Sequence, residues 1–266
     1  MKIAIIYNKK KKREVVKPVS QVFDWLRSKE HTVYVNPEEN ILKKRMDFAI
    51  AFGGDGSFLF AADRIAEYQI PLVGVNFGNR GYLCEIRKEN MFAEIEKIIA
   101  GRYKIQERTR IQAEIFHDGK NIGAISGLNE IYIGGINRTV SILIETIGKD
   151  KSFRASVTGD GAIFSTKTGS TAYNMNAGGP VLIVDGFSVV ANNALFESDI
   201  LLPNAKSFVT SSGAAFRVTL LNDKKQNLPY LVADGQRNYR FRPGDHVIIK
   251  RAPKSSYFVK LQAAVQ

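Results

Sequence analysis

Cysteine, tryptophan and long apolar runs are scarce in this sequence of 266 residues. The single cysteine, Cys84, excludes an internal disulfide and a metal site built from cysteines, and it suits a reducing cytoplasm. No apolar run approaches the roughly 20 residues that a membrane-spanning helix needs. The apolar stretch at residues 3–7 is too short for a signal peptide and predicts a first β-strand instead. We therefore expect a cytoplasmic protein that does not bind membranes.

Several familiar catalytic patterns are also missing. The sequence has no Walker A lysine segment and no HRD or DFG segment of the protein kinases. The histidines His31, His117 and His246 lack the spacing of metal ligands. We therefore predict no metal site built from protein side chains.

Basic residues outnumber acidic ones, 38 to 26, which gives a net charge of +12 and indicates an anionic partner. The basic residues are scattered, without a recognition helix or a row of stacking aromatic side chains, so we expect no nucleic-acid binding. A phosphate-rich small molecule explains the charge equally well. The basic run at 9–13 follows the first predicted strand, where ligands bind in open α/β sheets. It is either a loop at the mouth of a site or a solvated charge run.

The first hundred residues alternate predicted strands with helices, which favours a parallel, Rossmann-like sheet with right-handed crossovers. After about residue 103 the pattern changes to short strands, with a hairpin turn at Asp118 and Gly119. We expect this half to form a β-sandwich of stacked sheets. Its later strands are predicted at 181–184, 207–210, 216–221 and 230–232. The domain boundary is placed at 105, between an α/β domain (1–105) and a β-rich domain (106–245).

The most informative stretch is GGDGS, residues 53–57, which follows a predicted buried strand at 48–52 and precedes a helix. A strand, a glycine turn and a helix aim backbone N–H groups and a helix N-terminus at an anion such as phosphate. Asp55 would repel a bare phosphate, so we predict that it binds Mg²⁺ or accepts a proton from a substrate hydroxyl. The alternative is a tight turn in which Asp55 caps the helix.

Two polar clusters lie in the β-rich half. Asn129 and Glu130 precede an apolar strand, where a carboxylate is out of place unless it has a partner; a solvated turn is the alternative. Residues 158–180 are dense in Gly, Ser and Thr but include apolar anchors. Hydroxyls and glycine-freed amides suit ribose and phosphate oxygens, and Tyr173 offers a ring on which a base can stack.

These elements resemble the NAD kinase family in type, order and spacing: GGDGS at 53–57, Asn129 with Glu130, and GDG at 159–161 leading into STKTGSTAY at 165–173. The similarity extends over nearly the whole chain, to the DGQ segment at 234–236. It implies an α/β N-terminal domain, a β-rich C-terminal domain, and a last segment, 246–266, that returns to the first domain. The implied reaction is Mg²⁺-dependent transfer of the γ-phosphoryl group of ATP to the 2′-hydroxyl of the adenosine ribose of NAD, which gives NADP. Polyphosphate as donor and NADH as acceptor stay open.

The resemblance also implies residue roles. Asp55 is the base that faces the 2′-hydroxyl, and the residues that hold phosphates are Gly53, Gly54, Gly56 and Ser57. Asn129 and Glu130 bind the adenosine and its ribose. The remaining NAD-binding residues are Phe77, Thr171 and Tyr173 toward adenine, Asp160 and Ala172 toward nicotinamide, and Asn176 near the nicotinamide or a second nucleotide.

Four positions depart from the family's usual pattern. Ser57 replaces threonine and keeps the hydroxyl. Arg80 stands where leucine is usual, Lys167 replaces proline, and Asn176 replaces serine. The two additional cations leave the choice between NAD and NADH open.

Three rival functions share some of these features: a lipid or sugar kinase with the same glycine turn, a non-catalytic dinucleotide-binding regulator, and a nucleic-acid-binding protein. A regulator has no need of Asp55, and the last rival explains only the charge. The family resemblance further implies a homodimer or homotetramer formed through the β-rich domain, and exposed sheet edges favour such pairing.

Overall fold

The structure is a computed structural model that describes residues 1–9, 13–78, 81–135, 139–147, 153–198, 206–221 and 228–261. These residues form two compact units: unit 1 is Met1–Arg108 with Lys254–Gln266, and unit 2 is Thr109–Pro253. Most of the basic run at 9–13, and Arg80, lie outside the described residues. No described helix is both long and apolar enough to cross a membrane.

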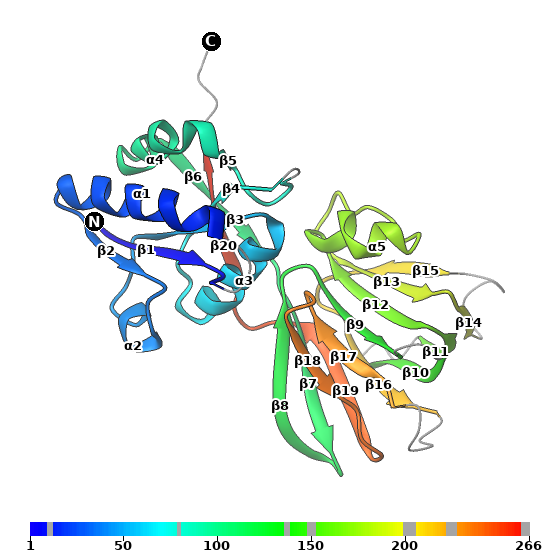
Figure 1. Cartoon of the computed structure of the whole chain (residues 1–266). Helices are drawn as coiled ribbons and strands as arrows, with labels where there is room; N and C mark the ends of the chain where they lie inside the picture. Colours follow the sequence, from blue (N-terminus) through cyan, green and yellow to red (C-terminus); the bar gives the residue numbers. More distant parts are fainter. Residues whose placement is uncertain are drawn as a thin grey trace. The chain divides into compact units, whose positions relative to one another are not determined.

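Unit 1 is built on one sheet with the strand order β2-β1-β3-β4-β20-β6, and β5 pairs with β4 (Figure 1). Its strands are β1 (Lys2–Tyr7), β2 (Thr32–Val35), β3 (Phe48–Gly53), β4 (Leu72–Asn76), β5 (Ile86–Arg87), β6 (Tyr103–Arg108) and β20 (Ser256–Leu261). Strands β1 to β5 pair in parallel, and β20 is parallel to β4 but antiparallel to β6. The predicted parallel α/β sheet is thus confirmed.

Helices cover both faces of this sheet, which explains why its strands are nearly all apolar. The helical elements are η1 (Arg13–Val15), α1 (Val16–Ser28), α2 (Glu39–Leu42), α3 (Asp55–Ile65), η2 (Ala66–Tyr68), η3 (Lys88–Asn90) and α4 (Met91–Ile99). Alternate strand residues such as Ile5 and Ile50 share one core with α1 and α4. On α3, Phe58 packs edge-on against Phe258 of β20 with ring centroids 4.8 Å apart.

Unit 2 is a sandwich of two antiparallel sheets, ordered β14-β11-β10-β16-β19-β7-β8 and β15-β13-β12-β9-β17-β18 (Figure 1). The strands of the first sheet are β7 (Ile111–His117), β8 (Lys120–Gly127), β10 (Val140–Ile147), β11 (Arg154–Gly159), β14 (Leu195–Ser198), β16 (Ala215–Leu220) and β19 (Asp245–Arg251). Those of the second are β9 (Glu130–Gly134), β12 (Gly161–Thr166), β13 (Phe187–Asn192), β15 (Ser207–Thr210), β17 (Tyr230–Ala233) and β18 (Arg237–Arg240). One core joins inward residues of both sheets, including Ile144 and Phe164, so the predicted β-sandwich is confirmed.

Two sequence-based positions differ from the structure. The strand predicted at 181–184 is wrong: this segment is a loop whose Leu182 N–H donates to Ser170 Oγ at 3.0 Å, and the buried strand β13 begins at Phe187. At the C-terminal end, β19 pairs with β7 and β16 in unit 2. The expected returning segment at 246–266 therefore starts inside β19, whereas unit 1 resumes at Lys254.

Replacing Ile50 by alanine tests the core of unit 1. Ile50 is fully buried in β3, and truncating such a side chain costs about 2–5 kcal/mol of unfolding free energy. Ile105→Ala in β6, where the side chain is 45% exposed, is the matched control and should cost far less. Urea unfolding followed by Trp25 fluorescence measures both, because the only tryptophan packs against this core. Equal losses in the two variants would contradict the assigned core.

Candidate functional site

The glycine turn predicted at 53–57 joins β3 to α3, and its geometry requires glycine at one position. Gly53 has φ +143°, and a Cβ atom there would lie 2.3 Å from Ser57 Oγ. Gly54 caps the helix, and its carbonyl accepts the N–H groups of Ser57 and Phe58 at 2.9 and 3.1 Å. Ser57 is buried, whereas Gly56 is exposed. The turn thus presents part of its main chain to solvent at the N-terminus of an eleven-residue helix.

Asp55 is the first residue of α3 and is half-buried. Its Oδ2 accepts the N–H of Tyr82 and its Oδ1 accepts the N–H of Leu83, both at 3.0 Å. No side chain makes a capping hydrogen bond at the start of α3. The helix-cap alternative is therefore wrong: the carboxylate is anchored by two backbone amides of the segment that follows β4. Because these donors are main-chain N–H groups, the residue types in the sequence could not predict them.

The loop after β4 lies against the glycine turn. The N–H of Phe77 donates to the carbonyl of Gly53 at 3.0 Å, and its ring lies 5.9 Å from the ring of Phe52. Asn76 Oδ1 accepts the N–H of Gly78 at 2.8 Å, which closes a tight turn. Phe77 is partly exposed beside the turn, and its contact with adenine stays a prediction.

Cys84 lies in the segment between β4 and β5 and contacts the end of β3. Its Sγ lies 3.7 Å from the carbonyl oxygen of Gly53. Burial, with a smaller contribution from the negative charge of Asp55, raises the pKa of the Cys84 thiol to about 12. The thiol is therefore neutral near pH 7 and unsuited to nucleophilic chemistry.

In unit 2, a buried carboxylate organises the segment that carries Asn129 and Glu130. Asp234, in the turn between β17 and β18, accepts the N–H groups of Leu128, Asn129 and Glu130 at 2.6, 2.8 and 3.0 Å. Burial raises the pKa of Asp234, although these three hydrogen bonds and the charge of Arg110 oppose that rise. The solvated-turn alternative is therefore wrong, because Asn129 is only 7% exposed.

Glu130 and Asn129 each carry an unsatisfied oxygen. Among the described residues, the buried atoms Asn129 Oδ1 and Glu130 Oε2 have no hydrogen-bond partner. Burial, and next the charge of Asp234, raise the pKa of Glu130 to about 8. A neutral Glu130 can both donate and accept a hydrogen bond. Such orphaned groups suit a polar ligand rich in hydroxyl and amino groups.

The segment at 165–171 packs directly on Asn129. The carbonyl of Asn129 accepts the N–H of Thr166 at 2.8 Å, and Thr166 Oγ1 donates to the carbonyl of Leu128 at 2.7 Å. Gly169 begins η4 (Gly169–Thr171), and a Cβ atom there would lie 2.1 Å from the Asn129 carbonyl oxygen. Only glycine allows this approach. The structure therefore brings together two clusters that lie about 40 residues apart in the sequence.

A second group joins Tyr173 to Asp160. Tyr173 begins α5 (Tyr173–Asn176), is 38% exposed, and packs edge-on against Tyr132 with ring centroids 5.6 Å apart. Tyr132 OH donates to the Asp160 carbonyl at 2.8 Å. The Asp160 carboxylate accepts Asn193 Nδ2 at 2.8 Å, and Asn192 Nδ2 donates to Tyr173 OH at 3.0 Å. One edge-on ring contact and one hydrogen bond to its hydroxyl thus hold the exposed ring of Tyr173 in place.

The remaining predicted residues flank this group. Thr171 and Asn176 are exposed and Ala172 is half-buried. Lys167 Nζ donates to the carbonyl of Ile183, so this additional cation is directed toward the loop at 181–184. Asp234, Tyr132 and Asn192 carry no role predicted from the sequence. Only Asp234 left a sequence signal, since Asp-Gly pairs are typical of tight turns.

Comparisons with known proteins place both halves of the chain in one family. Residues 39–103 match the ATP-NAD kinase N-terminal domain, and residues 128–261 match the ATP-NAD kinase C-terminal domain. The chain therefore belongs to the ATP-NAD kinase family, and it is an enzyme of the kinase class. The family resemblance predicted from GGDGS and TGSTAY is confirmed.

Individual relatives agree with this assignment. An NAD kinase from Corynebacterium diphtheriae is 35% identical over 222 residues, which cover 81% of this chain and 66% of that protein. An NAD kinase from Lachnoclostridium phytofermentans is 29% identical, with 98% of this chain and 94% of that protein covered. Two solved structures share the fold. An Archaeoglobus fulgidus NAD kinase in complex with ATP has a TM-score of 0.73 at 24% identity and covers 98% of this chain and 94% of its own. Yeast NADH kinase with NADH has a TM-score of 0.81 at 18% identity and covers 98% and 84%.

Glu130 makes the stability of unit 2 depend on pH. Its pKa is about 8 in the folded chain against 4.5 as the ordinary value, so the folded state holds the proton more tightly. Stability from this group is complete below pH 4.5 and is lost as the pH rises through about 8. Glu130→Gln, which mimics the neutral acid, should flatten this fall, and melting curves followed by circular dichroism from pH 5 to pH 9 measure it. The matched control is Glu107→Gln in unit 1, and an unchanged slope in Glu130→Gln would contradict the assignment.

Proposed function

We propose that this chain transfers the γ-phosphoryl group of ATP to the 2′-hydroxyl of the adenosine ribose of NAD and so forms NADP. The observation that carries the proposal is the match of both halves to the ATP-NAD kinase family. The first matched range contains the glycine turn with Asp55, and it also contains Phe77. The second matched range contains all the remaining predicted NAD-binding residues. We accordingly assign phosphoryl transfer to the α/β domain (1–105) and NAD binding chiefly to the β-rich domain (106–245).

The NAD-binding role rests on unsatisfied and exposed groups of unit 2. Asn129 Oδ1 and Glu130 Oε2 are buried acceptors without a partner among the described residues, and hydroxyl or amino groups of the adenosine would satisfy them. Tyr173 presents a fixed ring on which the adenine can stack. In the same assignment Thr171 and Phe77 contact the adenine. Asp160, Ala172 and Asn176 lie toward the nicotinamide.

Asp55 is proposed to orient the 2′-hydroxyl and accept its proton. Two amide hydrogen bonds fix the carboxylate but use only part of its capacity, since an ionised carboxylate offers about four lone-pair sites. A further hydrogen bond from a substrate hydroxyl is therefore possible without breaking either anchor. Phosphoryl transfer needs positioning and charge neutralisation more than it needs a strong base, and a firmly held carboxylate fits that need.

A divalent cation such as Mg²⁺ would enter with ATP. Within the described part of the chain, no three metal-ligating side chains come together. Mg²⁺ usually keeps several waters and binds substrate phosphates, so it needs no cluster of protein ligands. The cation would neutralise the donor phosphates, together with the turn that carries Gly53, Gly54, Gly56 and Ser57.

We also propose a cytoplasmic homo-oligomer, formed as a dimer or tetramer through the β-rich domain. Ile122 of β8 and Val209 of β15, which are edge strands in the described part of the chain, are 45% and 50% exposed. Exposed apolar edges of this kind favour pairing with another chain. Analytical ultracentrifugation at micromolar concentration should show a dimer or tetramer, and Ile122→Lys with Val209→Lys should shift it toward monomer. A wild-type chain that sediments only as a monomer would refute this proposal.

Replacing Asp55 by asparagine tests the proposed chemistry. Asparagine keeps the shape but cannot accept the proton, so turnover should fall by roughly 10²–10⁴-fold. NAD binding should change little, because the groups that hold adenosine are untouched. Formation of NADP from ATP, Mg²⁺ and NAD measures the turnover, and calorimetric titration with NAD measures the binding.

The control for this variant must lose a similar hydrogen bond. Asp55→Asn places an amide N–H₂ against one of the two backbone N–H donors and should cost about 1 kcal/mol of stability. Asp47 is exposed and accepts the N–H of Lys2 at 2.6 Å, so Asp47→Asn makes a comparable loss away from the turn. Near-normal turnover in Asp55→Asn, or an equal loss in Asp47→Asn, would refute the assigned role.

A further inference from the structure

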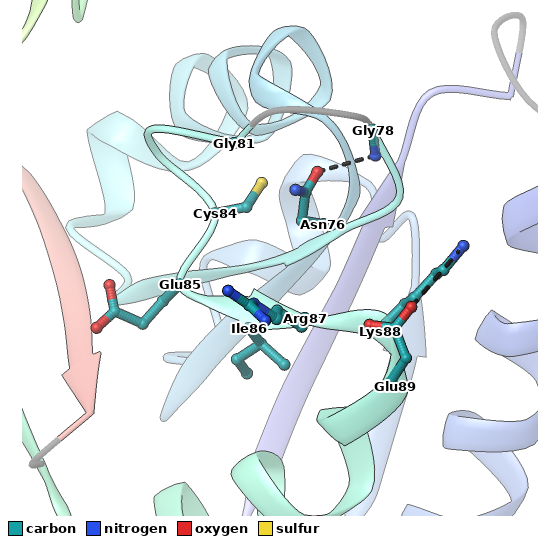
Figure 2. Close-up of a pocket in the computed structure, with 9 residues that line it drawn as sticks. All are labelled: Asn76, Gly78, Gly81, Cys84, Glu85, Ile86, Arg87, Lys88 and Glu89. Carbon is teal, nitrogen blue, oxygen red and sulfur yellow. Dashed lines mark hydrogen bonds and ion pairs between the residues drawn. The ribbon is translucent and has the colours of Figure 1, made fainter.

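A pocket of about 400 Å³ lies beyond the carboxyl ends of β4 and β5 in unit 1 (Figure 2). Asn76 is the last residue of β4 and Arg87 the last of β5. The residues that line it are Asn76, Gly78, Gly81, Cys84, Glu85, Ile86, Arg87, Lys88 and Glu89. Its volume falls in the range of about 300–1,000 Å³ that is usual for small-molecule sites. Ligands of open parallel sheets bind at this edge of the sheet.

The lining suits a phosphate chain better than a base. Ile86 is the only aliphatic side chain among the nine lining residues, and none of them is aromatic. The carboxylate of Glu85 is paired with Lys260 of β20, and Lys88 Nζ lies 4.0 Å from Glu89 Oε1. Arg87 is exposed and makes no ion pair within the described part of the chain. Its guanidinium can therefore meet an oxyanion with two parallel hydrogen bonds.

Neutral groups add donors to the same wall. The Asn76 side chain uses its oxygen to accept the N–H of Gly78, which leaves its Nδ2 group to donate to a ligand. Gly78 and Gly81 have no side chain to cover the main chain. The pocket thus offers one unpaired cation, an amide donor and accessible backbone.

The pocket shares two walls with the glycine turn. Gly81, Cys84 and Glu85 line it, while the N–H groups of the intervening residues 82 and 83 hold Asp55. On the other side, a Cβ atom on Gly54 would lie 3.9 Å from the Cα atom of the lining residue Gly78. A ligand in the pocket therefore contacts the same backbone segments that shape the turn and position Asp55.

We propose that this pocket binds the phosphate chain of the phosphoryl donor, with Arg87 as its anchoring cation and Asn76 as a neutral donor. The inference rests on the proposed function and names the place of its second substrate. In the transfer, the terminal P–O bond of the donor breaks and a P–O bond to the 2′-oxygen forms. The 2′-hydroxyl proton passes to Asp55, and the shortened chain keeps the bonding electrons. The pocket holds the phosphates that leave. The triphosphate of ATP and inorganic polyphosphate share this chemistry.

Direct binding of inorganic tripolyphosphate tests the site without relying on catalysis. Calorimetric titration of the full chain, without divalent cations, should show binding that Arg87→Ala weakens roughly 10- to 100-fold, the loss expected for hydrogen bonds to a charged group. Arg87→Lys keeps the positive charge but lacks the planar guanidinium that makes two parallel hydrogen bonds. Its affinity for tripolyphosphate should lie between those of the wild type and Arg87→Ala. Arg102→Ala is the matched control, because Arg102 is exposed in the same unit and is not one of the residues that line the pocket. Unchanged affinity in Arg87→Ala, or an equal loss in Arg102→Ala, overturns the proposal.

Kinetic arms identify the donor. If ATP occupies the pocket, it should displace tripolyphosphate, and Arg87→Ala should raise the KM for ATP roughly tenfold or more while the KM for NAD stays constant. If polyphosphate is the donor, the same shift should appear with polyphosphate and not with ATP. If Arg87→Ala leaves the KM for ATP and the KM for polyphosphate both unchanged, the donor assignment is overturned. Failure of the proposed function looks different: tripolyphosphate binding would still depend on Arg87, but no NADP would form with either donor.

Discussion

The capture of three consecutive backbone N–H groups by the Asp234 carboxylate is the interaction on which the β-rich unit's candidate site depends. Asp234 fixes the main chain from Leu128 to Glu130 immediately before β9 begins. Thr166 and Gly169 can then pack against the carbonyls of this segment. Without the carboxylate, three amides near the core would lack acceptors, at a cost of about 1–3 kcal/mol each. The close approach of η4 would lose its fixed partner.

The same interaction sets the electrostatics of the site. Because Asp234 is turned toward the N–H of Glu130, its charge adds to burial in raising the pKa of the Glu130 carboxyl. Arg110 offsets part of the cost of burying Asp234. The Asp234 carboxylate thus hydrogen-bonds to the backbone, and the neighbouring Glu130 carboxyl is mostly protonated near physiological pH. A neutral acid beside an unsatisfied Asn129 oxygen can exchange donor and acceptor roles with ligand hydroxyls.

Sequence patterns predicted what depends on periodicity and on turn chemistry, and failed where distant backbone groups meet. Alternating strands and helices indicated the parallel sheet, and the Asp118–Gly119 turn indicated the hairpin of β7 and β8, which the structure has. The strand expected at 181–184 failed because Ser170 ties that apolar run into a loop. Asp55 and Glu130 stood out as misplaced carboxylates. Backbone amides 27 and 28 residues away hold the Asp55 carboxylate, and an aspartate 104 residues away holds the main chain of Glu130, which no local pattern encodes.

Asp55 and Asp234 both accept backbone N–H groups with their carboxylates, but they differ in burial and in the number of hydrogen bonds that they accept. Asp234 accepts three N–H groups in a site from which solvent is largely removed, so little capacity remains for a ligand. Asp55 accepts two, one on each oxygen, and stays half-exposed at the start of a helix. A carboxylate that is anchored but not saturated keeps a defined direction and still offers lone pairs to an incoming hydroxyl or cation. Under the role proposed for Asp55, in a reaction that relies on positioning, this partial satisfaction is the property that separates its carboxylate from the structural carboxylate of Asp234.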